Sequence, residues 1–430
     1  MPRVAVVVVS RVWSSGRSVL GARFAAIGRG LVALAALLPA ASARGGSREV
    51  ELGVENFYYG TTQTPLNRDN RLGLDRDEGL LRGTLSLKAT AGSARGVFRG
   101  YLERTLGGEG DETRIELRQA YLQYGFGPGL SLRVGKQRIS WGSGFAWNPT
   151  NRVEPPKNPF NTGLEQEGAL AARMDLQPAA WAGLILVAAR GGTQVGDLPF
   201  GAANPRRETA AVRARFLVKD TDLALVVSGG AEQRTLLGFD IARDVAAEVS
   251  AHAEAAFYRG AELGRSRDAE TFFRLAAGAL WSQGDTALTL EYFFNGEGLS
   301  AAELDAYLGG LAGSYAAAVD PRLPGPLREQ ALGRYLAGAA LPYSGGLGLR
   351  RHYLQAAWTR SRIRGEWTAA LRGVAGLSDG GVALTPGLGY APRGDLTLSV
   401  DAVLLLGPAE SEYRLAPVRG AVQARVKVLF

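Results

Sequence analysis

The sequence predicts a closed antiparallel transmembrane β-barrel of about eighteen strands, with sixteen as the alternative count, behind an N-terminal export signal. Three observations favour this fold class. The first 43 residues have the composition of a signal peptide, long stretches after them alternate apolar and polar residues, and the connections between these stretches are short and long in turn. Alternating segments of about ten residues, separated by turn residues, are the pattern of transmembrane β-barrels.

Residues 1–43 predict a signal peptide. Five arginines precede the apolar run 31–38, and Ala41-Ser42-Ala43 has the small-residue spacing of a cleavage site. The segment holds no acidic residue, so removing its five arginines lowers the formal net charge from +8 to +3. Nucleic-acid binding requires a clustered basic face. We therefore expect no nucleic-acid partner for the mature barrel, residues 44–430.

After residue 43 the chain has neither a cysteine nor a long uninterrupted apolar run. The lack of cysteine fits an exported protein without disulfides. A membrane-spanning helix would need about 20 consecutive apolar residues, so none is expected. An exported chain of this kind is either periplasmic or a barrel of the outer membrane.

The last ten residues, AVQARVKVLF, distinguish between these two locations. Their apolar residues share one face of a strand, whereas Arg425 and Lys427 share the other. Because a charge that faces lipid costs about 2–4 kcal/mol at mid-bilayer, the basic face must look inward to water. The terminal Phe430 resembles the C-terminal signal of bacterial outer-membrane barrels. This resemblance implies the outer membrane of a Gram-negative bacterium and recognition by the barrel assembly machinery. The alternative is an edge strand of a soluble sandwich.

The same alternation recurs in eighteen segments along the chain. They begin near residues 49, 80, 95, 112, 129, 166, 180, 207, 221, 234, 245, 270, 285, 350, 362, 382, 394 and 417. Connections after even-numbered segments are short, and we place two of these turns at Arg243-Asp244 and Ser361-Arg362. Connections after odd-numbered segments tend to be long, with the stretch near 231–233 as the exception. In IELRQAYLQY the apolar face switches midway, which indicates a β-bulge.

One long connection resembles a known family. The stretch RVGKQRISWGSGFAWNPTNRVEPPKNP, preceded by LRQAYLQY, is similar to a segment shared by porin-like outer-membrane proteins, among them polymer-export (alginate-export-like) barrels. The similarity covers roughly residues 112–160, together with the terminal phenylalanine. It implies a porin-like barrel and carries little information about the substrate.

The connection 141–165 is the third external loop of such a barrel. In general porins the third loop folds into the lumen and narrows it, and we predict the same here. Glycines and prolines fit a stiff loop that turns sharply at the strand end. The candidate constriction residues are Trp141, Gly142, Gly144, Phe145, Trp147, Asn148 and Pro149, with the aromatic residues packing the loop against the wall. The alternative is an ordinary cap at the mouth.

No catalytic site is expected. The nucleophile elbow has glycine two residues on either side of its serine, and Ser143 has aromatic residues there. Ser250 and His252 share an inward face, but residues two apart on a strand are separated by about 6.5–7 Å, too far for a nucleophile–base hydrogen bond. Neither His252 nor His352 has companions at metal-ligand spacing. We therefore predict no enzyme, no cofactor and no metal.

Strand parity assigns charged residues to a lumen, which in an eighteen-strand barrel is aqueous. The pore-lining basic residues are Arg82, Lys88, Arg99, Arg133, Arg213, Arg215, Arg425 and Lys427, and the acidic ones are Asp240, Glu248, Glu254 and Glu291. Arg364 and Glu366 receive the same assignment. The basic residues concentrate near both chain ends and the acidic residues in the middle strands. Opposite arcs would create a transverse field that favours small polar or zwitterionic solutes. The alternative is scattered charge wherever water allows it.

The external stretch 295–349 is long enough to have a role of its own. Ser300 and Glu303 match a capping box, and PLREQALGRYL predicts a second short helix. The two helices could cover the pore or form a docking surface.

These patterns together predict a porin-like channel for passive diffusion of small polar or charged solutes through the lipid of the outer membrane. One alternative is a dedicated conduit for export or uptake of a polysaccharide or hydrophobic compound. Another is a non-conducting barrel that acts as a receptor or scaffold. Association into a homo-oligomer stays open, because lipid-facing and subunit-facing residues have the same composition.

Overall fold

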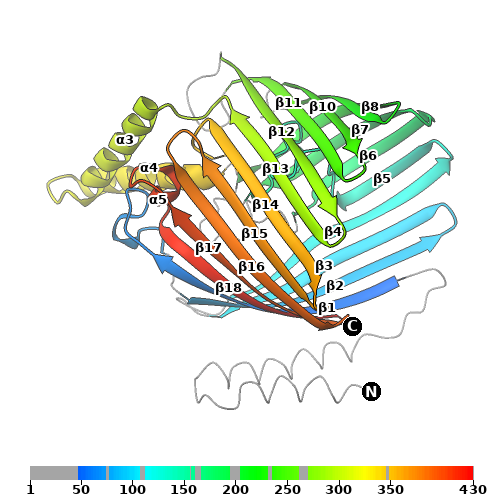
Figure 1. Cartoon of the computed structure of the whole chain (residues 1–430). Coiled ribbons are helices and arrows are strands. Elements are labelled where there is room, and N and C mark those ends of the chain that lie inside the picture. Colours follow the sequence, from blue (N-terminus) through cyan, green and yellow to red (C-terminus); the bar gives the residue numbers. More distant parts are fainter. Residues whose placement is uncertain are drawn as a thin grey trace.

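The computed structural model describes residues 47–73, 77–106, 112–154, 156–159, 166–193, 204–230, 235–260, 270–344 and 348–429. The predicted signal peptide and Phe430 lie outside these residues. Within them, eighteen strands form one antiparallel sheet in which each strand pairs with its neighbours in the chain (Figure 1). β1 also pairs with β18, in a register that places Glu51 opposite Leu429. The sheet is therefore closed, and no strand edge is left exposed.

All strands except β5, which has eight residues, reach the length of about nine residues or more that a tilted membrane crossing requires. The strands are β1 (Ser47–Thr61), β2 (Asp77–Ala91), β3 (Ala94–Leu106), β4 (Glu112–Gly127), β5 (Leu130–Gln137), β6 (Ala169–Ala179), β7 (Ala182–Thr193), β8 (Asn204–Val218), β9 (Thr221–Gly229), β10 (Leu236–Ala246), β11 (Val249–Arg259), β12 (Thr271–Gln283), β13 (Thr286–Asn295), β14 (His352–Ile363), β15 (Trp367–Gly376), β16 (Gly381–Arg393), β17 (Leu396–Leu406) and β18 (Val418–Leu429). All eighteen begin within five residues of the predicted positions.

Two predicted turns are wrong. The β10–β11 turn lies at Ala247-Glu248 instead of Arg243-Asp244, because the strand register shifts after Asp244 and β10 continues past it. The β14–β15 turn occupies residues 364–366, three residues later than predicted. Glu248, Arg364 and Glu366 therefore lie in turns and do not line the lumen wall. Residues 241–250, where β10 ends and β11 begins, contain no glycine or proline to mark the turn, and alternation alone does not locate it.

The predicted bulge in β4 is confirmed. Arg99 lies opposite Gln119 and Gly100 lies opposite Leu117, so Arg118 is the extra residue of β4. The Arg118 side chain is only 6% exposed, and its guanidinium carbon lies 4.6 Å from the ring centroid of Tyr101. The bulge thus adds a basic side chain to the inner face, next to Arg99.

The helices belong to the external connections. They are η1 (Arg68–Asn70), α3 (Ala301–Val319), α4 (Gly325–Ser344) and α5 (Glu412–Leu415). The capping box of Ser300 and Glu303 is confirmed at the start of α3, but α3 and α4 have 19 and 20 residues and are longer than predicted. None of the helices in the described part of the chain combines the length and apolar character needed to span a membrane.

α3 and α4 form a hairpin at the barrel rim opposite the end of β18 (Figure 1). Its base packs on residues from the neighbouring connections. The buried cluster contains Leu66, Leu299, Leu304, Leu311, Tyr335, Ala339, Leu349 and Leu415. The hydroxyl of Tyr335 also accepts a hydrogen bond from the backbone N–H of Arg68 at 2.7 Å. The connections β1–β2, β13–β14 and β17–β18 are therefore packed together.

Candidate functional site

The connection between β5 and β6 folds back into the barrel and rests on two carboxylates of the opposite wall. Glu254 of β11 and Glu291 of β13 are both 0% exposed. They share the inner face with His252, whereas Phe257 of β11 is 50% exposed on the outer face. Residues 143–150 of this connection thus lie inside the barrel, against strands that are distant from β5 and β6 in the sheet order.

Glu254 holds both ends of a tight turn in this loop. Its Oε2 accepts hydrogen bonds from the backbone N–H groups of Ser143 and Gly144 at 3.1 and 3.3 Å. Its Oε1 accepts bonds from the backbone N–H and the hydroxyl of Thr150 at 2.8 and 2.6 Å. The side-chain amide of Asn148 donates a further, longer bond of 3.4 Å. One carboxylate therefore ties residues 143–150 into a compact unit by charge-assisted hydrogen bonds.

Glu291 binds the next stretch of the same turn. Its oxygens accept hydrogen bonds from the backbone N–H groups of Phe145, Ala146 and Trp147, the last two at 2.9 and 3.0 Å. Nε2 of His252 lies 2.8 Å from Oε2 of the same carboxylate. The histidine is thus a neighbour of the loop anchor.

Aromatic residues of the loop pack on the inner wall. The Trp147 ring stacks on Phe293 of β13, with centroids 4.9 Å apart and planes 9° from parallel. Phe145 meets His252 edge-on at 4.7 Å. Trp141 is 5% exposed and joins an apolar cluster with wall residues of β6–β12, among them Val187 and Val226. All three aromatic residues contact the wall, and the effect of the loop on the passage stays a prediction.

The glycines of the loop are required by close approaches. Gly142 has φ +89°, and a Cβ there would lie 2.6 Å from Oε2 of Glu254. A Cβ on Gly144 would overlap the carbonyl oxygen of Trp147. Pro149 follows Asn148 within the turn, and the backbone N–H of Asn151 donates to the Asn148 carbonyl at 3.1 Å.

Substituting Gly144 by alanine should loosen the loop. The added methyl group has no space, and overpacking of this kind costs about 1–3 kcal/mol. The chain has no cysteine, so a single Ala146→Cys reporter, at a position that is 0% exposed, can measure loop opening by its rate of maleimide labelling. We expect Gly144→Ala to raise that rate about tenfold. Gly394→Ala, where a Cβ meets nothing within 4 Å, should leave it unchanged. Equal rates in both variants would contradict the tight packing at Gly144.

Glu154 fixes the base of the loop, a role that the sequence did not reveal. It is 3% exposed and accepts a hydrogen bond from Nε of Arg138 at 2.8 Å, and another from the backbone N–H of Ile139. Nζ of Lys157 donates to the carbonyl of Gly144 at 2.5 Å. The alternation of inner and outer side chains along the strands carries no information about these contacts, because both residues of each pair lie outside the strands, in the loop.

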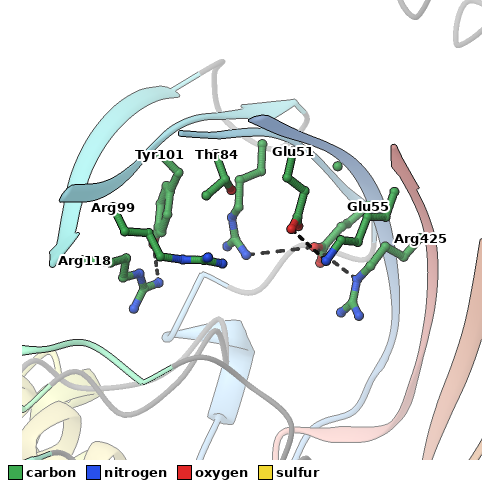
Figure 2. A pocket seen from close by; sticks show the side chains of 10 residues that line it. Glu51, Glu55, Thr84, Arg99, Tyr101, Arg118 and Arg425 are labelled. Atoms are coloured by element: carbon green, nitrogen blue, oxygen red, sulfur yellow. Dashed lines mark hydrogen bonds and ion pairs between the residues drawn. The ribbon is translucent and has the colours of Figure 1, made fainter. Parts of the chain in front are cut away.

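A second group of charged side chains lines a polar pocket on β1–β4 and β18. Its lining includes Glu51, Gly53, Glu55, Arg82, Thr84, Arg99, Tyr101, Arg118, Arg425 and Lys427. Figure 2 shows several of these side chains pointing from the curved wall into the same space. Five basic side chains and two carboxylates face this pocket.

Ion pairs across neighbouring strands order this wall. Lys427 lies 2.7 Å from Glu51, and Arg425 lies 3.2 Å from Glu55. Arg82 pairs with Glu103 of β3 at 2.7 Å. Each pair joins adjacent strands, as expected for opposite charges that face each other across a sheet.

Tyr101 organises the arginines of the pocket. The guanidinium carbons of Arg82 and Arg118 each lie 4.6 Å from its ring centroid, within cation–π range. Its hydroxyl accepts a hydrogen bond from Arg118 and donates one to Glu116. Sequence analysis missed Tyr101, Glu116 and Arg118. The face switch in IELRQAYLQY was the available signal for Arg118.

The remaining predicted lumen residues are spread along the wall. Arg213 pairs with Asp240 at 2.9 Å, and the Arg133 guanidinium lies over the Tyr121 ring at 4.9 Å. Arg215 pairs with Asp222 near the β8–β9 turn, where it is half exposed. Lys88 is exposed near the end of β2.

The expected pair of opposite charged arcs is wrong. Glu254 and Glu291 are covered by the loop that they bind, so they present no charge to lumen water. Other carboxylates lie among the basic residues of the opposite wall and pair with them. Glu254 and Glu291 therefore anchor the loop, whereas Asp240 pairs with Arg213 on the wall. The field at the polar pocket depends on the charges of the pocket itself.

The comparisons with known proteins identify the fold. No protein-family model and no curated protein matches the chain. OprD of Pseudomonas aeruginosa, an outer-membrane protein, has a TM-score of 0.52 at 12% identity, over 91% of this chain and 97% of its own. OccAB1 of Acinetobacter baumannii has a TM-score of 0.55 at 8% identity, over 90% and 98%. OccK2 (OpdF) of Pseudomonas aeruginosa has a TM-score of 0.54 at 12% identity, and the match covers 89% of this chain and 98% of OccK2. At such identities the likeness shows the fold alone, and it confirms the predicted porin-like barrel.

Proposed function

We propose that this protein is an outer-membrane channel through which small polar or charged solutes diffuse passively. The observation that carries the proposal is the division of the barrel interior. The loop and its apolar contacts occupy part of the inner faces of β6–β13, whereas β1–β4 and β18 present a charged, water-compatible pocket. A solute would pass along this polar wall.

The outer surface supports a membrane location. Large apolar side chains face outward on the strands, and among them Leu122 is 72% exposed, Val134 52% and Leu225 51%. Exposed apolar area of this extent on every side of a soluble protein would be unusual, and an apolar band is what lipid requires. Recognition by the barrel assembly machinery and association into a homo-oligomer remain predictions.

Single-channel conductance of the refolded mature protein, residues 44–430, in a planar bilayer tests the function. We expect steady conductance. The reversal potential under a salt gradient should show a preference for anions, because basic side chains outnumber the carboxylates that line the pocket. A barrel that conducts no ions would contradict the proposal and favour a dedicated conduit or a receptor.

We further propose that the loop 138–159 narrows the passage. Deletion of residues 146–158 removes two of the three loop residues that donate to Glu291 and two of the four that donate to Glu254. It should raise the single-channel conductance. Deletion of residues 321–324 at the tip of the external hairpin is the control and should leave the conductance unchanged. Equal conductance in the wild type and the loop deletion would mean that the loop does not restrict the channel.

A further inference from the structure

The short helix α5, in the connection between β17 and β18, packs on both the loop in the lumen and the hairpin outside. Tyr413 of α5 and the following Ala416 belong to the same buried cluster as Ala146 and Trp147 of the β5–β6 loop. Leu415 of α5 belongs instead to the buried cluster under the α3–α4 hairpin. Figure 1 shows α5 beside the hairpin at the barrel rim. The two buried clusters therefore share one helix.

Tyr353, near the start of β14, links the same two parts through its ring and its hydroxyl group. Its ring centroid lies 6.1 Å from that of Trp147 and 6.3 Å from that of Phe293, on which Trp147 stacks. Its hydroxyl accepts a hydrogen bond from the backbone N–H of Arg350 and donates one to Glu412 of α5, both at 2.5 Å. The ring thus contacts the loop, and the hydroxyl holds two external connections.

A row of side chains along the barrel wall makes a second link. Arg152 of the loop and Arg274 of β12 both lie over the ring of Tyr258 on β11, each 4.5 Å from its centroid. Arg274 also lies 3.5 Å from Glu297, which precedes the N-cap residue Ser300 of α3 by three positions. Arg274 and Glu297 are 3% and 2% exposed, and separating a buried ion pair is costly. The loop is therefore joined to the start of the hairpin through the wall.

The base of the hairpin depends on the residues that Tyr353 holds. Arg350 donates from Nη1 to the carbonyl of Ser300 at 3.1 Å. The backbone N–H of Leu299 donates to the carbonyl of Leu349 at 2.7 Å. α3 therefore cannot leave the rim without disturbing Arg350, which is bonded to the Tyr353 hydroxyl.

We propose that the loop in the lumen and the α3–α4 hairpin open as one cooperative unit, so that displacing the hairpin outside also releases the loop inside. Segments that share buried contacts open together, with a single opening free energy. Here the shared contacts are those of α5, Tyr353 and the Arg152–Tyr258–Arg274 row. The consequence for conduction rests on the proposed function, but the coupling itself does not. A labelling experiment that needs no conduction can therefore fail or succeed independently of the channel.

Maleimide labelling of buried cysteines tests whether the two parts open together. The chain has no cysteine, so Ala146→Cys reports on the loop and Ala339→Cys, in α4, reports on the base of the hairpin. Both positions are 0% exposed. When opening and closing are fast, the labelling rate follows the equilibrium population of the open form. The full mature protein in detergent micelles is the sample.

One substitution in each part supplies the perturbation. Gly144→Ala overpacks the loop, and Leu304→Ala leaves a cavity under α3, where Leu304 is 5% exposed. We expect each variant to raise the labelling rate at both reporters by the same factor, about tenfold. If Gly144→Ala changed only the rate at residue 146, and Leu304→Ala only the rate at residue 339, the parts would open independently and the proposal would be wrong.

Two controls separate coupling from general loosening. Leu327→Ala makes the same change as Leu304→Ala at a side chain that is 50% exposed on the hairpin, and it should alter neither rate. Ala224→Cys, at a position of β9 that is 1% exposed, reports on unfolding of the barrel and should not respond to Gly144→Ala or Leu304→Ala. An equal rise at residues 146, 339 and 224 would assign the effect to unfolding of the whole barrel and overturn the proposal.

Tyr353→Phe tests the link itself. This variant keeps the ring beside Trp147 and removes the hydroxyl that holds Arg350 and Glu412. In the Tyr353→Phe background, Gly144→Ala should raise the labelling rate at residue 146 more than the rate at residue 339. Equal rises in that background would overturn the assignment of Tyr353 as a link between the loop and the hairpin.

Discussion

Replacing both Glu254 and Glu291 by alanine should release the loop from the wall and raise single-channel conductance by a factor of about two or more, because the lumen of a barrel this size is otherwise wide. Six backbone N–H groups of residues 143–150 donate to these two carboxylates. Each hydrogen bond to a charged group contributes about 1.5–3 kcal/mol. Without the carboxylates these buried N–H groups would have to find water, and the loop would leave the wall to do so.

Asp240→Asn is the matched control for this experiment. Asp240 is another buried inner-wall carboxylate, 3% exposed, and it pairs with Arg213. The Asp240→Asn replacement removes one carboxylate charge, as each glutamate replacement does, but among the described residues it breaks no hydrogen bond to the loop. The conductance should therefore stay near the wild-type value. Conductance of the double variant equal to that of Asp240→Asn would show that Trp147 and Trp141 hold the loop without the carboxylates. Isosteric Glu291→Gln should give an intermediate result, since one side-chain oxygen still accepts.

The barrel itself could be predicted from the sequence because each strand carries its own signal. A lipid-facing side chain and a lumen-facing side chain alternate by necessity, so the pattern is clear in most segments, with β4 and β10 as the irregular ones. The positions of the turns were predicted less accurately than the strands. Where β10 continues past Asp244 with an irregular register, alternation gives no end point, and Glu248 was misplaced for this reason.

The role of the anchoring acids could not be predicted in the same way. Parity correctly puts Glu254 and Glu291 on the inner face, but their partners are backbone N–H groups of a loop more than a hundred residues earlier. A signal was nevertheless present in β6–β9. Their inner faces carry apolar residues such as Val187, Ala211 and Val226, all at most 4% exposed. Parts of strands that are apolar on both faces indicate a part of the wall that something covers, and here the loop covers it.

Arg99→Glu should shift the channel towards cations, because it changes the charge of the polar pocket by two units. Arg99 lies in the pocket with Arg82 and Arg118, and its Nη1 donates to Ser86 at 3.1 Å. A unit charge about 10 Å from a passing ion contributes about 0.4 kcal/mol in water without salt, and about a third of that at about 0.1 M salt. Because cations and anions respond oppositely, a change of two units alters the cation-to-anion preference roughly threefold. The measurement is the reversal potential under a salt gradient, at about 0.1 M where the Debye length is about 10 Å.

Lys88→Glu makes the same charge change and serves as its control. Both residues were predicted to line the pore from parity, but Lys88 is exposed near the end of β2 and does not line the pocket. Solvent and salt screen the charge at position 88, so the reversal potential of the Lys88→Glu channel should stay close to that of the wild type. Equal shifts in the two variants would mean that ions sense the strand ends as strongly as the pocket. The passage would then not follow the wall of β1–β4 and β18, since only a path along that wall makes Arg99 the more effective of the two charges.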